Sequence, residues 1–264
     1  MKNRVIILLG AALLLVSCSV TGKQEGSVRL MQYNVGVFHK SGENSAPDVA
    51  ALIKEYKADI VSLNELDSCN TRNPEYQLRE LAYGLGGWEY RFGRAISYRD
   101  GAYGDGIVTP SAIVYGAAGN LPHFEGSEVR AFVVVETAQY VFISTHLDYE
   151  YENARLQQTR IINNYVLGKY GRSTKPVFLA GDLNAPRNEA CMQEFAQYWD
   201  ILTPDQPTYP SDGADICIDY IMVLRNPGFT RVTPLKSGVI TKSKVARLDR
   251  ASDHLPVFAD VRIK

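Results

Sequence analysis

Hydrophobic residues gather in short stretches along most of the chain, and in four places they recur at helical spacing. The short stretches predict strands at 28–35, 59–63, 89–92, 112–115, 129–136, 140–145, 177–179, 216–223 and 257–263. Spacing of three and four residues predicts helices at 47–56, 75–83, 152–167 and 188–198. Strand pairs between helices are typical of sheets that helices cover, so we expect one mixed α/β domain.

The N-terminus carries a pattern of its own. Lys2 and Arg4 precede an unbroken apolar run over 5–16, which is shorter than the roughly 20 residues of a membrane-spanning helix. A basic start, a short apolar run and small residues afterwards are typical of a secretory signal. The run ends in the string LVSC. This string resembles the lipobox of bacterial lipoproteins, in which the cysteine becomes the lipidated first residue of the mature chain.

The resemblance to a lipobox divides the chain into three parts. It implies a lipoprotein signal peptide over 1–17, a lipidated tether over 18–26 that begins at acylated Cys18, and a folded domain over 27–264. The protein would then be exported and anchored to the lipid bilayer of a bacterial cell envelope. Ser19 replaces the aspartate that holds many such proteins at the inner membrane, so we expect the outer membrane in a Gram-negative cell. The alternative is a plain signal peptide with a chance cysteine.

Polar residues follow six of the apolar stretches. The six strings are Tyr33-Asn34, Asn64-Glu65, Thr145-His146, Gly181-Asp182-Leu183-Asn184, Ile218-Asp219-Tyr220 and Ser252-Asp253-His254. Any one of them has a simple interpretation, such as an asparagine that completes a turn. Buried carboxylates and amides are costly unless they are paired or bind a cation, and six such strings exceed what a core needs. Together they predict a polar site built from strand ends.

In their order and spelling these strings resemble the endonuclease/exonuclease/phosphatase superfamily, which includes deoxyribonuclease I and the exonuclease III-type repair nucleases. The matching strings are MQYNV, VSLNELD, STHLD, FLAGDLNA, CIDYI and SDHLPV, and they extend from about residue 28 to residue 262. The resemblance implies a four-layered α/β/β/α sandwich, with two packed mixed sheets flanked by helices and the site at one edge of the sheets. It also implies metal-dependent hydrolysis of a phosphate ester.

The resemblance also implies metal ligands. Glu65 matches the principal metal-binding glutamate of the family, and Asn34 lies beside it in the family arrangement. Asp253 is a further candidate ligand, and its alternative role is to cap the turn before the last strand. Carboxylate and amide oxygens suit Mg²⁺, or Mn²⁺, better than a soft metal. We therefore expect Mg²⁺ as the cofactor.

Five further residues match catalytic positions of the family. Asp182 would orient or deprotonate the attacking water, and Asn184 would donate to a phosphoryl oxygen. His254 resembles the essential histidine, with Asp219 as the carboxylate that fixes its tautomer. His146 would be a second donor to the phosphate. Whether His254 acts as a base or as a phosphate ligand stays open.

Three residues are weaker candidates for substrate contact. Arg72 lies in a stretch that resembles a substrate edge in several bacterial relatives, and Arg130 opens a strand and faces either phosphate or solvent. Tyr103 begins the string YGDGIVTP, where the family often has a YGNAILSR-like stretch. The asparagine and the arginine of that stretch are missing, and we interpret the string as a loop. Arginines and tyrosines upstream of it are consistent with a nucleotide or sugar-phosphate site, and equally with a surface hairpin.

Charge limits the partners. The chain has 28 basic and 29 acidic side chains, and removal of 1–17 with its two basic residues leaves 26 and 29, a net charge of −3. This excludes a strongly basic protein that coats nucleic acid and gives no support to DNA as substrate, although nucleic acid stays possible. We expect a monomer that acts on a phosphate ester, a phosphodiester before a monoester. DNA, RNA, sphingolipid, inositol phosphate and sugar phosphate all stay open.

A non-catalytic binding lipoprotein on the same fold is the alternative function. The chain retains every catalytic residue type named above, and a protein that has lost catalysis usually lacks at least one of them. The remaining cysteines are Cys69, Cys191 and Cys217, which form no CxxC pair and have no zinc-finger spacing. Small buried thiols are the simpler interpretation of these three, with one disulfide as the alternative.

Overall fold

The computed structural model describes residues 22–123, 128–226 and 231–264. The predicted signal peptide over 1–17, Cys18 and the first part of the tether lie outside the described residues. In the described part of the chain no helix is long and apolar enough to cross a membrane. Both buried cysteines, Cys191 and Cys217, and the exposed Cys69 are free thiols, so the described cysteines form no disulfide.

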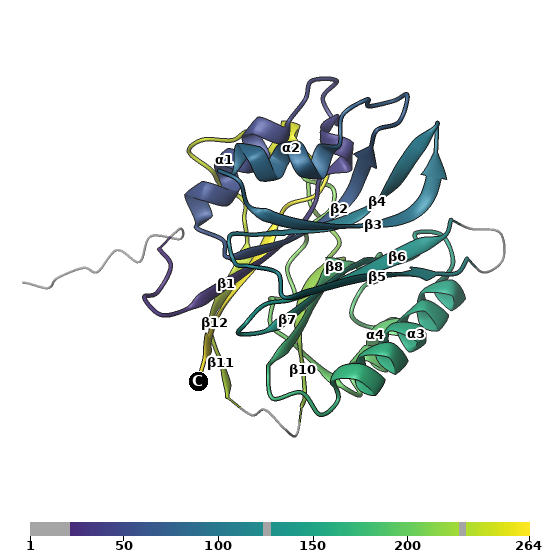
Figure 1. The fold of residues 1–264 in the computed structure, drawn as a ribbon, viewed down its shortest axis with the longest axis vertical. Helices are drawn as coiled ribbons and strands as arrows, with labels where there is room; N and C mark the ends of the chain where they lie inside the picture. Colours follow the sequence, from purple (N-terminus) through teal and green to yellow (C-terminus); the bar gives the residue numbers. More distant parts are fainter. Residues whose placement is uncertain (1–21, 124–127, 227–230) are drawn as a thin grey trace, which may run out of the picture.

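Two six-stranded mixed sheets pack face to face, with helices on both outer faces (Figure 1). The first sheet runs in the order β11 (Val232–Val239), β12 (Val257–Ile263), β1 (Val28–Asn34), β2 (Ile60–Ser68), β4 (Gly101–Thr109) and β3 (Glu89–Tyr98). The second runs β5 (Tyr115–Leu121), β6 (Arg130–Glu136), β7 (Val141–His146), β8 (Val177–Asp182), β10 (Asp219–Leu224) and β9 (Trp199–Ile201). This is the predicted four-layered α/β/β/α sandwich.

The helices bury the faces that their spacing predicts. On the first sheet lie α1 (Ala46–Tyr56) and α2 (Gln77–Gly84), and on the second lie α3 (Glu152–Tyr170) and α4 (Ala190–Phe195) (Figure 1). Two short helices, η1 (Gly36–Phe38) and α5 (Leu248–Ala251), occupy connections. A proline in its first turn starts α1, and left-handed Lys57 ends it by donating its N–H to Ile53 and Lys54. Between these ends the apolar stripe of α1 is buried against the first sheet.

The strand order brings the polar strings to one edge. The parallel pairs β1–β2 and β7–β8 end at the same edge of their sheets, with Asn34 opposite Asn64 and His146 opposite Asp182. The antiparallel strand β10 begins there, with Asp219 opposite Asp182. Apolar side chains of both sheets fill the space behind this edge. The site therefore lies at one end of a packed core, as the sequence predicts.

Several predicted elements were wrong. The string YGDGIVTP is not a loop, because Tyr103 to Thr109 lie inside β4, a strand paired on both sides. The glycines of this string allow neighbouring backbones to lie close together. A Cβ on Gly104 would lie 2.0 Å from the carbonyl oxygen of Gly93 in β3. The strand predicted at 112–115 begins only at Tyr115, and β9 and β11 were not predicted.

Candidate functional site

Strand ends from both sheets line a pocket of about 400 Å³. Eight residues that the sequence singled out line it: Glu65, Tyr103, Arg130, His146, Asp182, Asn184, Asp253 and His254. Asn34 and Asp219 lie behind this lining and contact it through hydrogen bonds. Arg72 is the one candidate that lies outside both groups. Four lining residues were not predicted, namely Glu128, Tyr149, Tyr209 and Ile218.

The backbone is strained at two of these residues. Glu65 has a φ of 60° and Asn184 a φ of 49°, a left-handed conformation that non-glycine residues adopt at a cost. In β2 the pairing with β4 shifts between Leu63 and Leu66, which marks a bulge around Glu65. Strict alternation would place neighbouring Asn64 and Glu65 on opposite faces. Because of the bulge both side chains reach the site edge.

His254 and Asp219 form a buried pair. The Nδ1 of His254 lies 2.9 Å from Oδ2 of Asp219, and its Nε2 lies 3.5 Å from Oδ2 of Asp182. Burial by itself would lower the pKa of His254, but the carboxylates of Asp219 and Asp182 outweigh it and raise this pKa to about 10. His254 is therefore an imidazolium at neutral pH, with one N–H held by Asp219 and the other directed at Asp182 and the pocket.

Asp182 occupies the centre of the site. Its Oδ2 accepts a hydrogen bond of 3.0 Å from the amide of Asn34, and its Oδ1 accepts one of 2.9 Å from the backbone N–H of Asn184. Burial raises the pKa of Asp182 to about 6, although attraction to His254 lowers it in part. A carboxylate with this pKa is ionised at neutral pH and is still basic enough to accept a proton from water.

His146 differs from His254 in charge. Burial, followed by the nearby positive charges of Arg130 and His254, holds the pKa of His146 well below its usual range, so this imidazole is neutral. Its Nε2 lies 3.0 Å from the amide nitrogen of Asn184, which also donates to the carbonyl of Leu147. The amide that the sequence assigned to a phosphoryl oxygen is thus engaged with the protein here. Asn184 positions His146 in this structure.

The structure separates the three weaker candidates. Arg130 faces the pocket and not solvent: its Nη1 lies 3.1 Å from Glu128, and its buried Nε has no hydrogen-bond partner among the described residues. Tyr103 lines the pocket as well. Arg72 instead lies behind Tyr103, in a bidentate ion pair with Asp67 at 2.8 Å. Arg130 and Tyr103 therefore face the pocket, whereas Arg72 packs against the ring of Tyr103, 5.8 Å from its centroid.

A chain of buried amides behind the pocket was missed. Gln32 donates to Asn64 at 2.6 Å and to Asp219 at 3.2 Å, and Asn64 donates to Asp105 at 2.9 Å. Burial raises the pKa of Asp105 to about 7. The sequence contained two indications of this chain of amides. Gln32 and Asn34 are two residues apart in one strand and so lie on the same face, and Asp105 stands where the family stretch has asparagine. This chain fixes Asp219 from the side opposite His254.

The oxygen donors of the pocket fit a hard divalent cation. Asp182, Asp219 and His254 each offer a ligand atom within 4.8 Å of the others. Asp219 pairs with His254, and Glu128 pairs with Arg130. The remaining carboxylates of the pocket lining, which can hold a metal, are Asp182, Glu65 and Asp253. Burial raises the pKa of Glu65, although the hydrogen bond from Asn34 and attraction to His254 lower it in part. Carboxylate oxygens of this kind are ligands for Mg²⁺.

Asn34 directs the nitrogen of its side-chain amide, and not the oxygen, at these carboxylates. Its Nδ2 donates to Glu65 and to Asp182, both at 3.0 Å, while its Oδ1 accepts from the backbone N–H of Gly36. To ligate a metal, Asn34 would have to rotate its amide and offer the oxygen. As placed, it orients the two carboxylates.

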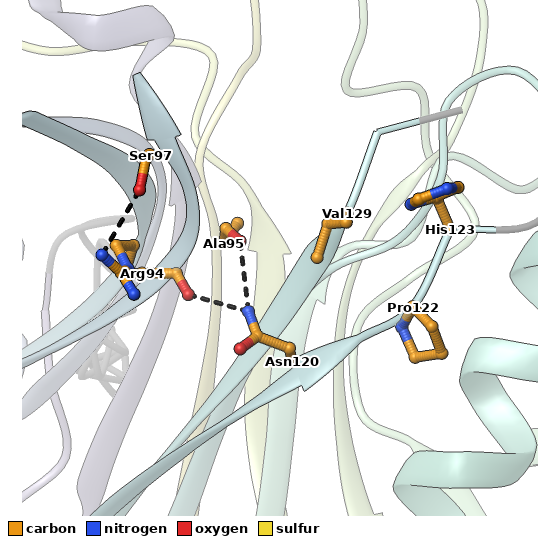
Figure 2. Close-up of a pocket in the computed structure, with 7 residues that line it drawn as sticks. All are labelled: Arg94, Ala95, Ser97, Asn120, Pro122, His123 and Val129. Atoms are coloured by element: carbon orange, nitrogen blue, oxygen red, sulfur yellow. Dashed lines mark hydrogen bonds between the residues drawn. The ribbon is translucent and has the colours of Figure 1, made fainter. Parts of the chain in front are cut away.

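A second hollow of about 520 Å³ lies between β3 and the end of β5 (Figure 2). Its lining consists of Arg94, Ala95, Ser97, Asn120, Pro122, His123 and Val129. The amide of Asn120 donates to the carbonyls of Arg94 and Ala95 at 3.0 and 3.1 Å and so joins the two sheets. None of these described lining residues is a carboxylate, so the hollow offers no ligand set for a hard cation. The acidic side chains, together with His146 and His254, line the first pocket instead.

Comparison with known proteins agrees with this geometry. The pattern of the Endonuclease/Exonuclease/phosphatase family matches residues 31–254, while no curated protein sequence matches the chain. A mannosyl-6-phosphatase from Bacteroides thetaiotaomicron has a similar structure, with a TM-score of 0.74, 17% identity and coverage of 89% of this chain and 99% of that one.

Two further solved structures are similar as well. The human Nocturnin catalytic domain has a TM-score of 0.66 at 19% identity, covering 90% of this chain and 94% of that one. D. rerio TDP2, solved with a single-strand DNA product, has a TM-score of 0.67 at 16% identity. The match covers 90% of this chain and 99% of that one. At these identities the likeness shows the fold, and the family match covers most of the chain. The chain belongs to the endonuclease/exonuclease/phosphatase family, whose members are divalent-metal-dependent phosphoester hydrolases.

Proposed function

We propose that the protein is a Mg²⁺- or Mn²⁺-dependent phosphohydrolase. The observation that carries this proposal is the charge arrangement of the pocket: an imidazolium, His254, held by Asp219 at 2.9 Å, faces the buried carboxylate of Asp182. A base, a cationic donor and free carboxylates for a metal are what hydrolysis of a phosphate ester requires. A non-catalytic binding protein would have no use for a histidine and an aspartate held at such shifted pKa values.

The protein's residues divide the work as follows. A bound Mg²⁺ held by Glu65 and Asp253 would neutralise charge on the phosphoryl group. Asp182 accepts the proton of the attacking water, because its pKa of about 6 leaves it ionised at neutral pH. His254 donates its Nε2–H to a phosphoryl oxygen, and Asp219 fixes that orientation. Arg130 lines the same pocket and brings its positive charge to the phosphoryl group.

Two substrate types deserve the first tests. Phosphodiesters are the substrates we propose first, in line with the sequence. Sugar phosphomonoesters are the second candidate, because one structural neighbour is a mannosyl-6-phosphatase and because a pocket of about 400 Å³ suits a small ligand.

The decisive assay uses the purified protein with bis-p-nitrophenyl phosphate, p-nitrophenyl phosphate and mannose 6-phosphate. We expect turnover with Mg²⁺ or Mn²⁺ and none in excess EDTA, with full recovery when metal is added back. An unchanged rate in EDTA would show that the metal assignment is wrong. No hydrolysis of any ester with either metal would favour the non-catalytic alternative.

We also propose that the protein is exported and anchored through acylated Cys18, on the strength of the LVSC string. Labelled palmitate should enter the wild-type protein and not Cys18→Ser, and only the wild type should partition into the detergent phase of a Triton X-114 extract. Cys191→Ser is a matched control, because Cys191 is buried in the core and should not affect labelling. Equal labelling of wild type and Cys18→Ser would contradict the anchor.

A further inference from the structure

Two tyrosines at the pocket have no role in the proposed chemistry, and we call this pair, Tyr149 and Tyr209, the aromatic mouth. Tyr149 and Tyr209 both line the pocket, and they are 62% and 37% exposed. They are two of the six large hydrophobic side chains that are exposed in the described part of the chain. Because both rings line the same pocket and are accessible, a ligand in the pocket can pack against them.

The two rings contact different residues of the pocket. The ring of Tyr209 is centred 4.8 Å from the ring of His254. His254 contacts Asp182, and Asp182 in turn lies 3.4 Å from Nε2 of His146. His146 lies 3.4 Å from Arg130, whose guanidinium is 5.7 Å from the ring centroid of Tyr149. Both rings therefore border the place where a phosphoryl group at Asp182 and His254 would lie, and the rest of the substrate can pack on them.

Both tyrosines are attached to well-anchored backbone. Tyr209 pairs with Ile216 through two backbone hydrogen bonds of 3.1 Å. Tyr149 is followed by Glu150 and Tyr151, whose N–H groups donate to the buried carboxylate of Asp148 at 2.8 and 2.7 Å. Rings held in this way lose little conformational freedom when a ligand packs against them.

Charge indicates what kind of group packs there. Arg130 is the one arginine or lysine among the described lining residues, and it is faced by four acidic ones, Glu65, Glu128, Asp182 and Asp253. His254 is the further cation on the lining, and Arg130 and His254 both serve the reacting phosphoryl group, so a leaving group with further phosphates would meet the carboxylates and find no cation of its own. A neutral ring avoids this repulsion and packs its apolar face on a tyrosine, while its hydroxyl groups find partners in the tyrosine hydroxyls and Glu128.

We propose that Tyr149 and Tyr209 bind the leaving group of the substrate, and that this group is a neutral, hydroxylated ring the size of a hexose. This assignment rests on the proposed phosphohydrolase function. It makes the two tyrosines specificity residues that contact the part of the substrate away from the reacting phosphorus.

The test compares two phosphate esters that differ in the leaving group. Glucose 6-phosphate carries a hexose ring, and glycerol 3-phosphate carries hydroxyl groups without a ring. In Tyr149→Ala and Tyr209→Ala we expect KM for glucose 6-phosphate to rise about fivefold to a hundredfold, the range for the loss of one stacked ring. The KM for glycerol 3-phosphate and both kcat values should change less than about twofold. Tyr149→Phe and Tyr209→Phe should restore most of the discrimination because they keep the ring.

Tyr83→Ala is the matched control. Tyr83 is 63% exposed, on α2 and outside the pocket, so its loss should leave both substrates unaffected. An equal fall in kcat/KM for both esters in Tyr149→Ala and Tyr209→Ala would overturn the proposal, since it would show a structural effect. A wild-type preference for adenosine 5′-monophosphate over glucose 6-phosphate that the same variants abolish would overturn the hexose assignment in favour of a nucleoside.

A binding experiment separates this proposal from the proposed function. Titration calorimetry of glucose 6-phosphate and glycerol 3-phosphate into Asp182→Asn protein with Mg²⁺ measures affinity without turnover. Tighter binding of glucose 6-phosphate that Tyr149→Ala abolishes would support the aromatic mouth even if no ester were hydrolysed by the wild type. Equal affinity for the two compounds, or no binding of either one, would overturn it, whatever the outcome of the hydrolysis assay.

Discussion

At the scale of single residues, the hydrogen bond between His254 and Asp219 holds the proposed donor in place. In Asp219→Asn the histidine loses the carboxylate that contributes most to its raised pKa, so we expect kcat to fall by about 10²–10⁴-fold. The alkaline limb of the pH–rate profile should also move to lower pH, because an imidazolium with a lower pKa loses its proton earlier. Initial rates between pH 5 and 11 measure both effects.

Asp249→Asn provides the control for this change, because Asp249 is exposed and forms an ion pair with Arg247 outside the pocket. Its kcat and pH profile should match those of the wild type. A wild-type rate in Asp219→Asn, with unchanged circular dichroism, would remove His254 and Asp219 from the proposed chemistry.

Much of the site could be predicted from the sequence because its residues follow strands. An apolar strand followed by Asp182 or His146 places the polar side chain at a sheet edge whatever the rest of the fold does. Tyr149 and Tyr209 follow no such rule, since both lie outside the strands, where periodicity carries no information. The hydrogen bonds of Asn184 were equally out of reach, because they depend on side-chain rotation and not on chain order.

At the scale of elements, β8 places Asp182 in the pocket, and Gly181 allows β8 to lie close to β7 just before that residue. A Cβ at Gly181 would lie 2.0 Å from the carbonyl oxygen of Thr145 in the neighbouring strand β7. Gly181→Ala must therefore push the two strands apart, at a cost of about 1–3 kcal/mol. We expect the melting temperature to fall by roughly 2–10 °C, and kcat to fall with it, because Asp182 shifts. Differential scanning calorimetry and the phosphatase assay measure the two effects.

Gly168→Ala is the matched glycine control in α3. A Cβ there meets nothing within 4 Å, and alanine suits a helix interior better than glycine, so the melting temperature should stay the same or rise slightly. A Gly181→Ala protein as stable as the wild type would show that β7 and β8 can separate without strain.

Elements with clear periodicity were predicted, and those that depend on partners were not. The stripe of α1 and the apolar run of β8 specify helix and strand by themselves. In contrast, β4 alternates glycines with larger residues, and only pairing with β2 and β3 makes it a strand. The edge strand β11 is largely exposed or half-buried, so its sequence lacks the apolar signal.

At the scale of the whole molecule, the packing of one sheet on the other creates the site, and no local pattern specifies it. Two side chains of the first sheet donate hydrogen bonds to carboxylates of the second: Asn34 donates to Asp182, and Gln32 donates to Asp219. The family resemblance implied this packing, whereas composition and periodicity predicted only layers. Activity should therefore depend on how the two sheets are held together as well as on the residues of the pocket.

A buried hydrogen bond between the sheets shows how strongly they are held together. Oγ of Ser62 in β2 lies 2.7 Å from Oγ of Ser144 in β7, and both residues are fully buried. Ser62→Ala leaves the hydroxyl of Ser144 without its partner, so we expect the free energy of unfolding to fall by about 1–3 kcal/mol. Ser144→Ala should cost less, because the Ser62 hydroxyl still reaches the carbonyl of Ala180 at 3.4 Å. The double variant should cost less than the sum of the two, since it leaves no hydroxyl unpaired. Urea unfolding with unchanged m-values measures the three differences, and additive costs would mean that the two hydroxyls do not interact across the sheets.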